Sequence, residues 1–248
     1  MSNNKSYYND TLTRLFKVLM MIRAVILDWM NTIARAEPDR HEQYIQVCHE
    51  FGIEASPLKV VRGIYAACTQ VPQGVPHKFN ESEDPEVFLR FHNIVLSEVG
   101  VKVSRETALE MLKKESEIAR KERYVLYDDV LPTLETLKQR GLILGLLTTV
   151  TKDVNIYREL GLEPYLNSIV TSKEVGANKP EPAIFLAALE RAGVSASEAV
   201  YVGDQYETDV VGARGGGIKP ILIDRWDLLS EVIDCPRIHA LTEVFEHL

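Results

Sequence analysis

Short apolar runs recur along the chain, and each ends abruptly at glycine or at polar residues. The first run, Ala24–Leu27, is followed directly by Asp28. A continuous apolar run of this length is typical of a strand that is buried on both faces of a parallel sheet. Similar runs lie at residues 142–147, 169–170, 199–202 and 220–223. The pattern therefore predicts a sheet built from these short buried strands.

Helical segments separate the later apolar runs. Residues 152–160 end at Gly161, and Pro182–Ala192 ends at Gly193, which is the usual glycine stop of a helix. Ser195 and Glu198 have the spacing of a capping box, so a short helical turn is expected before residue 199. Strands that alternate with helices predict an α/β fold, a Rossmann-like doubly wound parallel sheet.

Residues 37–123 break this alternation, because only helical patterns occur there. One helix face is formed by apolar residues at helical spacing, before a stop at Gly52: Tyr44, Val47, Cys48 and Phe51. Three more helices are expected to begin after the capping residues Ser56, Asp84 and Ser104. The proline- and glycine-containing stretch 70–83 predicts an irregular surface loop. We expect a helical insertion after the first strand.

Composition narrows the class of protein. The 248 residues carry 28 Lys and Arg against 36 Asp and Glu, a net charge of −8, which disfavours nonspecific nucleic-acid binding. No apolar run approaches the roughly 18 residues of a membrane span. The cysteines Cys48, Cys68 and Cys235 form no CxxC pair, so reduced thiols and a cytoplasmic protein are expected. Residues 1–20 are interpreted as an N-terminal extension without signal-peptide features.

Polar residues collect where the predicted strands end. Asp28 opens the stretch DWMNT after the first strand, Thr148 and Thr149 follow the second, and Asp204 follows the fourth. Lys179 stands in the segment GANKP between the third and fourth strands. Ligands of doubly wound sheets bind outside the carboxyl ends of the strands, so these side chains are candidates for a common site.

The order of these motifs resembles the haloacid dehalogenase (HAD) superfamily of aspartyl-nucleophile hydrolases. The most specific piece is GDQYETDVVGAR at residues 203–214, and the likeness extends over the chain after Arg23. It includes a helical cap between the first and second motifs. The resemblance implies a Rossmann-like core of residues 21–36 and 124–248 and a small all-helical cap of residues 37–123.

The resemblance also implies roles for individual residues. In the family the first aspartate attacks the substrate and forms a covalent aspartyl intermediate, and this role falls on Asp28. Thr148 corresponds to the hydroxyl of the second motif and Lys179 to the lysine of the third. Asp204 and Asp209 correspond to the acidic fourth motif.

The chemistry of these residue types fits phosphate transfer. A carboxylate that approaches a phosphate dianion is repelled, so a cation is needed between them. The carboxylates of Asp28 and Asp204 and the carbonyl of Met30 could supply oxygen ligands for Mg²⁺. Asp209 is a further candidate ligand, although orienting Lys179 or a metal-bound water suits it better.

The remaining candidates would bind the phosphoryl group. Lys179 would offset the charge on its oxygens and keep Asp28 ionised. The hydroxyl of Thr148 would donate a hydrogen bond to the same oxygens, and Thr149 is a second candidate for substrate binding.

Met30 departs from the family pattern. HAD phosphatases usually carry a second aspartate at this position, which protonates the leaving oxygen and later activates water. Such general acid–base catalysis contributes about 10²- to 10⁴-fold in rate. In a phosphatase or phosphotransferase the proton could come from Glu37, Asp39 or His41, or a leaving group of low pKa such as an acyl phosphate could need none.

Two other hypotheses remain. Dehalogenases have a tyrosine at this position and lack the metal, which the Asp204 and Asp209 pair disfavours. Phosphonate-cleaving members carry a similar DWAGT motif but need a cap lysine, where this chain has Cys68, with Lys59 well short of it. A binding or regulatory protein without turnover could also keep a Mg²⁺ and phosphate pocket. Asn31, where the family commonly has glycine, is compatible with that hypothesis.

The sequence as a whole favours a Mg²⁺-dependent hydrolase that acts through Asp28 on a small phosphorylated metabolite. Substrate specificity is expected in the cap and in the loop at residues 70–83. We expect a monomer or a homodimer, with neither a nucleic-acid nor a membrane partner.

Overall fold

The structure, a computed structural model, describes residues 21–71, 84–149 and 155–248. The predicted extension 1–20, nearly all of the loop 70–83 and the start of the helix at 152–160 lie outside the described residues. The chain divides into two compact units: one holds the described residues up to Ala34 together with Leu126–Leu248, and the other holds Arg35–Val125.

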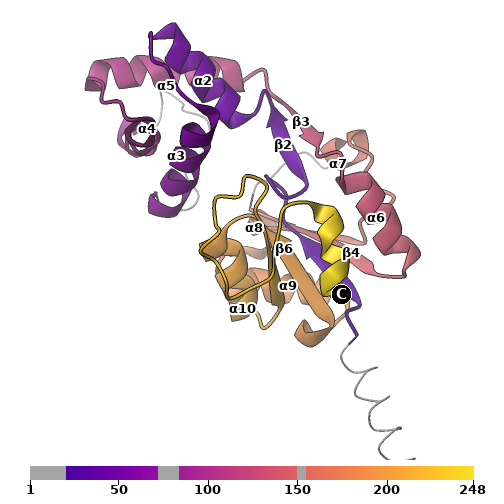
Figure 1. The fold of residues 1–248 in the computed structure, drawn as a ribbon. Coiled ribbons are helices and arrows are strands. Elements are labelled where there is room, and N and C mark those ends of the chain that lie inside the picture. Colours follow the sequence, from indigo (N-terminus) through magenta and orange to yellow (C-terminus); the bar gives the residue numbers. More distant parts are fainter. Residues whose placement is uncertain (1–20, 72–83, 150–154) are drawn as a thin grey trace, which may run out of the picture. The chain divides into compact units, whose positions relative to one another are not determined.

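A six-stranded sheet forms the centre of the first unit, and its strands β4 and β6 are labelled in Figure 1. The strand order is β5-β4-β1-β6-β7-β8. Every neighbouring pair is parallel. Strand β1 is central and pairs Ala24 with Ile143 of β4 on one side and with Ala199 of β6 on the other. The strands are β1 (Ala24–Leu27), β4 (Ile143–Thr148), β5 (Ser168–Thr171), β6 (Ala199–Gly203), β7 (Lys219–Ile223) and β8 (Arg237–Ile238). The predicted parallel α/β sheet is confirmed.

Helices connect the strands of this unit. The longer ones are α6 (Val130–Gln139) and α9 (Pro182–Ala192), and the shorter elements are α7 (Asn155–Glu159), α8 (Ser172–Val175), α10 (Val211–Gly215), η1 (Ala196–Glu198), η2 (Tyr206–Val210) and η3 (Leu241–His247). Phe185 of α9 packs edge-on against Tyr201 of β6 in a core cluster that also contains Ile26 of β1. The helix end at Gly193 and the Ser195–Glu198 capping box are confirmed.

Four helices make up most of the described part of the second unit: α2 (Arg40–Glu50), α3 (Pro57–Gln70), α4 (Pro85–Val99) and α5 (Arg105–Ala119). The predicted caps Ser56, Asp84 and Ser104 each accept a backbone N–H of the first turn. A Cβ atom on Gly63 of α3 would lie 2.8 Å from the Cα atom of Val95 in α4, so glycine permits this close helix pair.

The sequence did not predict three short strands. Strands β2 (Ala34–Glu37) and β3 (Arg123–Leu126) form a two-stranded sheet, and β8 contains only two residues. Four-residue strands that contain charged and half-exposed positions give too weak an alternation to detect. The three cysteines are free thiols. Among the described residues no helix has the length and apolar character needed to cross a membrane.

Candidate active site

The carboxyl ends of three adjacent strands carry the candidate residues. Asp28 follows β1 and continues its ladder, because its N–H donates to the carbonyl of Val202 in β6 (2.8 Å). Thr148 ends β4, and Asp204 follows β6. Since β4, β1 and β6 are neighbours in the sheet, all three residues reach the same edge.

Lys179 joins two of the predicted carboxylates. Its Nζ atom lies 2.5 Å from Oδ1 of Asp28 and 2.6 Å from Oδ1 of Asp209. All three residues are buried. The Tyr201 hydroxyl donates to Oδ1 of Asp209 (2.9 Å) and accepts from Lys179 Nζ (3.2 Å). The lysine is therefore fixed by three side chains from different parts of the chain.

A π-helical turn, η2, brings Asp209 back toward the end of β6. The N–H of Val210 reaches the carbonyl of Gln205 five residues earlier (3.3 Å), and the Gln205 N–H in turn donates to Oδ2 of Asp209 (2.9 Å). A Cβ atom on Gly203 would lie 2.4 Å from Cγ of Asp209. Glycine at residue 203 is therefore what allows the carboxylate to approach the strand end.

The turn that follows Asp28 connects the nucleophile candidate to the acidic motif. Asn31 has a left-handed backbone (φ 57°), a conformation that glycine and asparagine adopt more readily than other residues. Asparagine at residue 31 is therefore compatible with the backbone of this turn. Its Nδ2 atom donates to Oδ2 of Asp204 (3.2 Å). The Thr32 hydroxyl makes a long contact of 3.5 Å with Oδ2 of Asp28.

Asp28, Asp204 and Asp209 together could hold a metal ion. Each offers a carboxylate oxygen, and these oxygens all lie within 4.8 Å of one another. Among the described residues, one ammonium, that of Lys179, contacts this group of three carboxylates, so ionisation of all three would leave two negative charges uncompensated by it. A divalent, oxygen-binding cation fits this donor set in both charge and ligand type.

Burial and mutual repulsion shift the ionisation of the cluster. Burial, opposed by Lys179 and reinforced by Asp209, raises the pKa of Asp28 to about 6. Burial and the carboxylates of Asp28 and Asp209 hold the pKa of Asp204 well above its ordinary value. Burial alone would lower the pKa of Lys179, but Asp209 and Asp28 outweigh it and raise that pKa. The two carboxylates therefore favour the charged form of Lys179.

The structure thus brings Asp28, Lys179, Asp204 and Asp209 together. Thr148 is buried at the end of β4 and Thr149 is half-buried beside it, at the same sheet edge. The half-buried Met30 follows Trp29, which packs edge-on against Tyr157 at a ring distance of 5.2 Å. The roles assigned to these residues stay predictions.

The three candidates for a replacement acid have local partners in the second unit. Glu37 accepts from Nε of Arg123 (2.7 Å), and Asp39 caps α2. His41 Nδ1 lies 2.8 Å from Oδ1 of Asp39.

Sequence reasoning missed Tyr201 and the bond made by Asn31. Tyr201 lies inside an apolar strand and reads as a core residue. The available signal was its hydroxyl, because a buried tyrosine usually needs a hydrogen-bond partner. Asn31 stands out in the sequence as a departure from glycine, and that difference does not predict its bond to Asp204.

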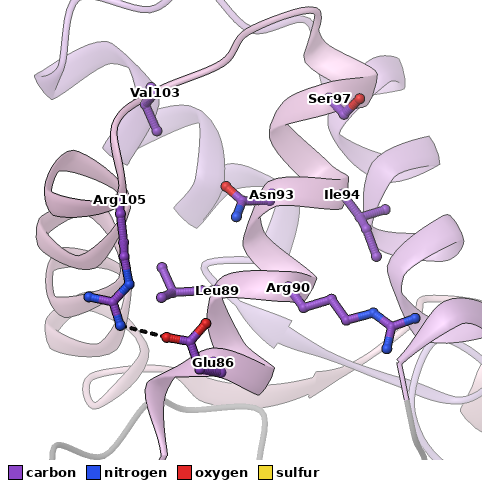
Figure 2. Close-up of a pocket in the computed structure, with 8 residues that line it drawn as sticks. All are labelled: Glu86, Leu89, Arg90, Asn93, Ile94, Ser97, Val103 and Arg105. Carbon is purple, nitrogen blue, oxygen red and sulfur yellow. Dashed lines mark hydrogen bonds and ion pairs between the residues drawn. The ribbon is translucent and has the colours of Figure 1, made fainter.

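A separate hollow of about 590 Å³ lies on the second unit, over α4 and the start of α5 (Figure 2). Arg105 and Glu86 form an ion pair of 2.5 Å at its edge, and Arg90 and Asn93 also line it. Asp28, Asp204 and Asp209, which we call the acidic cluster, do not line this hollow. The hollow is therefore distinct from the candidate site.

Comparison with known proteins decides the family. Residues 22–217 match the haloacid dehalogenase-like hydrolase family, over most of the chain. The chain belongs to this family. It is therefore a hydrolase with the family's α/β core.

Relatives within the haloacid dehalogenase-like family match to different extents. The haloacid dehalogenase-like hydrolase domain-containing protein 3 of Danio rerio is 29% identical, over 91% of this chain and 94% of its own. A glyceraldehyde 3-phosphate phosphatase of Methanopyrus kandleri is 40% identical, but over only 40% of this chain and 43% of that enzyme. A HAD phosphatase from Thermococcus onnurineus has a similar structure, with a TM-score of 0.56 and 26% identity over 91% of this chain and 97% of that one.

Proposed function

We propose that this protein is a Mg²⁺-dependent phosphatase that hydrolyses a small phosphorylated metabolite through an aspartyl-phosphate formed on Asp28. The observation that carries the proposal is the Lys179 ammonium, which contacts both Asp28 and Asp209 beside a third carboxylate, Asp204. An acidic cluster with one fixed lysine suits a site for a metal ion and a phosphate group. The partial match to a glyceraldehyde 3-phosphate phosphatase supports the same substrate class.

Asp28, Asp204 and the Met30 carbonyl would hold the ion. When bound, Mg²⁺ supplies positive charge between the attacking carboxylate and the phosphate oxygens. Lys179 holds Oδ1 of Asp28 and keeps the carboxylate ionised and oriented for attack on phosphorus. Asp209 and Tyr201 position Lys179 by accepting hydrogen bonds from its Nζ atom.

The phosphate oxygens of the substrate would bind at the carboxyl end of β4. The hydroxyls of Thr148 and Thr149 would donate to them, and Lys179 would offset their charge. The second unit, Arg35–Val125, would act as the cap that selects the remainder of the substrate and excludes water.

The direct test is hydrolysis of p-nitrophenyl phosphate with and without metal. We expect turnover in Mg²⁺, loss of nearly all turnover in excess EDTA, and recovery when Mg²⁺ exceeds the chelator, because the carboxylate cluster needs a cation to admit a phosphate dianion. Thermal stabilisation by Mg²⁺ and phosphate is measured on the same samples. Turnover that survives EDTA contradicts the metal-dependent mechanism, and stabilisation without any turnover contradicts catalysis.

Met30→Asp is expected to restore the missing acid. Alkyl phosphates have leaving groups of high pKa that need a proton, whereas p-nitrophenolate leaves without one. Turnover of an alkyl phosphate should therefore rise by about 10²-fold, with a much smaller change for p-nitrophenyl phosphate. The ratio of the two kcat values is the measurement, with Met30→Asn as the control that is polar but not acidic. An equal rise for both substrates would remove the missing-acid explanation.

A further inference from the structure

Arg225 binds the turn that carries the nucleophile candidate. It lies just after β7, and its Nη2 and Nε atoms donate to the carbonyl oxygen of Thr32 at 2.7 and 3.3 Å. The same guanidinium donates to both carboxylate oxygens of Asp129, each at 3.1 Å. Both side chains are largely buried, with 11% and 17% exposed. A bidentate, largely buried ion pair of this kind fixes the orientation of both side chains and also neutralises their charges.

Further contacts hold this pair in place. The guanidinium carbon of Arg225 lies 3.8 Å from the centre of the Tyr127 ring. Asp129 also accepts the N–H of Leu241, at the start of η3, at 2.6 Å. Arg225 therefore ties the turn after β1 to the start of α6 and to the C-terminal segment, all within the first unit.

The bonded carbonyl lies at the far end of the turn from Asp28. The turn closes when the N–H groups of Ile33 and Ala34 donate to the Trp29 carbonyl, at 3.1 and 3.0 Å. At its near end the backbone is held by β6, through the Asp28 N–H. The Tyr127 N–H also holds the far end, through the Ile33 carbonyl (3.2 Å), and Arg225 adds a side-chain bond at Thr32.

We propose that Arg225, braced by Asp129, is a positioning residue that holds the Asp28–Ala34 turn in its working geometry. It touches neither the acidic cluster nor the predicted phosphate ligands, so it would act only through the backbone of Thr32. The catalytic part of this proposal rests on the phosphatase function proposed above, whereas the effect on the turn does not. A small displacement of a nucleophile is enough to lower turnover strongly.

The test compares Arg225→Met and Arg225→Lys with Arg191→Met. Arg191 is a matched control, because it also donates to a backbone carbonyl, that of Ile169 (3.2 Å), and to a carboxylate, that of Glu174, but at an exposed place beside β5. Hydrogen exchange of the backbone amides of residues 28–34 is measured by mass spectrometry, together with kcat and KM for p-nitrophenyl phosphate in Mg²⁺.

We expect faster exchange of the turn in Arg225→Met, a kcat lower by about 10- to 100-fold and a KM within about threefold of the original. Arg225→Lys keeps the charge and one donor, so it should fall between Arg225→Met and the unmodified protein. Arg191→Met should change neither measurement. If Arg225→Met folds poorly, the lysine variant carries the same test.

Unchanged exchange and kcat in both Arg225 variants would overturn the proposal. A parallel change in exchange throughout the sheet would also overturn it, because the residue would then be a general stabiliser. If the unmodified protein hydrolyses no phosphate ester but the turn still exchanges faster in Arg225→Met, the phosphatase function fails and the structural role of Arg225 stands.

Discussion

Asp28→Asn is expected to reduce hydrolysis of p-nitrophenyl phosphate by more than about 10³-fold, to the level of a blank. The substitution preserves the size of the side chain and leaves an oxygen that can accept from Lys179. It removes the negative charge and the nucleophilic oxygen that would bond to phosphorus. Asp128→Asn makes the same chemical change at an exposed residue and should leave turnover unchanged.

The same variant has a second expected effect, on stability, that does not depend on turnover. The pKa of Asp28 is about 6 in the folded protein, above its ordinary value of 3.8. A carboxyl group with a raised pKa binds protons more tightly in the folded state, so its ionisation removes stability as the pH rises from about 4 to about 6. Asp28→Asn should therefore melt at a higher temperature than the unmodified protein at about pH 8 in EDTA, and this advantage should vanish below about pH 4.

These two measurements distinguish a chemical role from a folding defect. Low turnover combined with a raised melting temperature identifies Asp28 as a group placed for chemistry at the expense of stability. Turnover within tenfold of the original would contradict the role of Asp28 as nucleophile, whatever the melting temperature.

Lys179→Met should damage both catalysis and folding. The ammonium is the one cation in contact with Asp28 and Asp209 among the described residues, and methionine fills a similar volume without charge. Loss of a preorganised cation from the transition state costs about 10²- to 10³-fold in kcat. Removing one partner of a buried ion pair costs about 3–5 kcal/mol in the free energy of unfolding.

The destabilisation by Lys179→Met should depend on pH. Without the ammonium the three carboxylates repel one another only when they are ionised, so the loss in melting temperature should be large at about pH 8 and smaller at about pH 5. Lys138→Met is the matched control, because Lys138 donates to the Pro164 carbonyl at the surface. A kcat within threefold of the original and an unchanged melting temperature would contradict the central position given to Lys179.

The sequence predicted the fold wherever a local pattern was strong. Strand β1 and helix α9 have the predicted boundaries, because a wholly apolar run and a proline-to-glycine segment are unambiguous signals. The sequence did not predict strands β2 and β3. Each has four residues, some of them charged, and the two strands can pair only after the rest of the chain has folded. The pairing of β2 with β3 joins residues distant in the sequence, so no local sequence pattern predicts it.

In the candidate site, too, some residues could be predicted from the sequence and others could not. Asp28, Lys179, Asp204 and Asp209 could be proposed from their order along the chain, and the structure places them together. The Tyr201 hydroxyl reaches Asp209 because the π-helical turn η2 returns the chain toward β6, a geometry that depends on the folded backbone. Arg225 reaches Thr32 across a sequence separation of 193 residues, which only the fold can reveal.

The central position of β1 has a consequence for how the protein is made. Of all the described strands it is synthesised first, yet its partners β4 and β6 become available only after residues 143 and 199 have been added. Pairings so distant in sequence form slowly, since a long loop must close before they contribute stability. During synthesis, the contacts among Asp28, Lys179 and Asp209 can therefore form only after most of the chain has emerged from the ribosome. Under the proposed function, a nascent chain would therefore hydrolyse no phosphate ester until the sheet is complete.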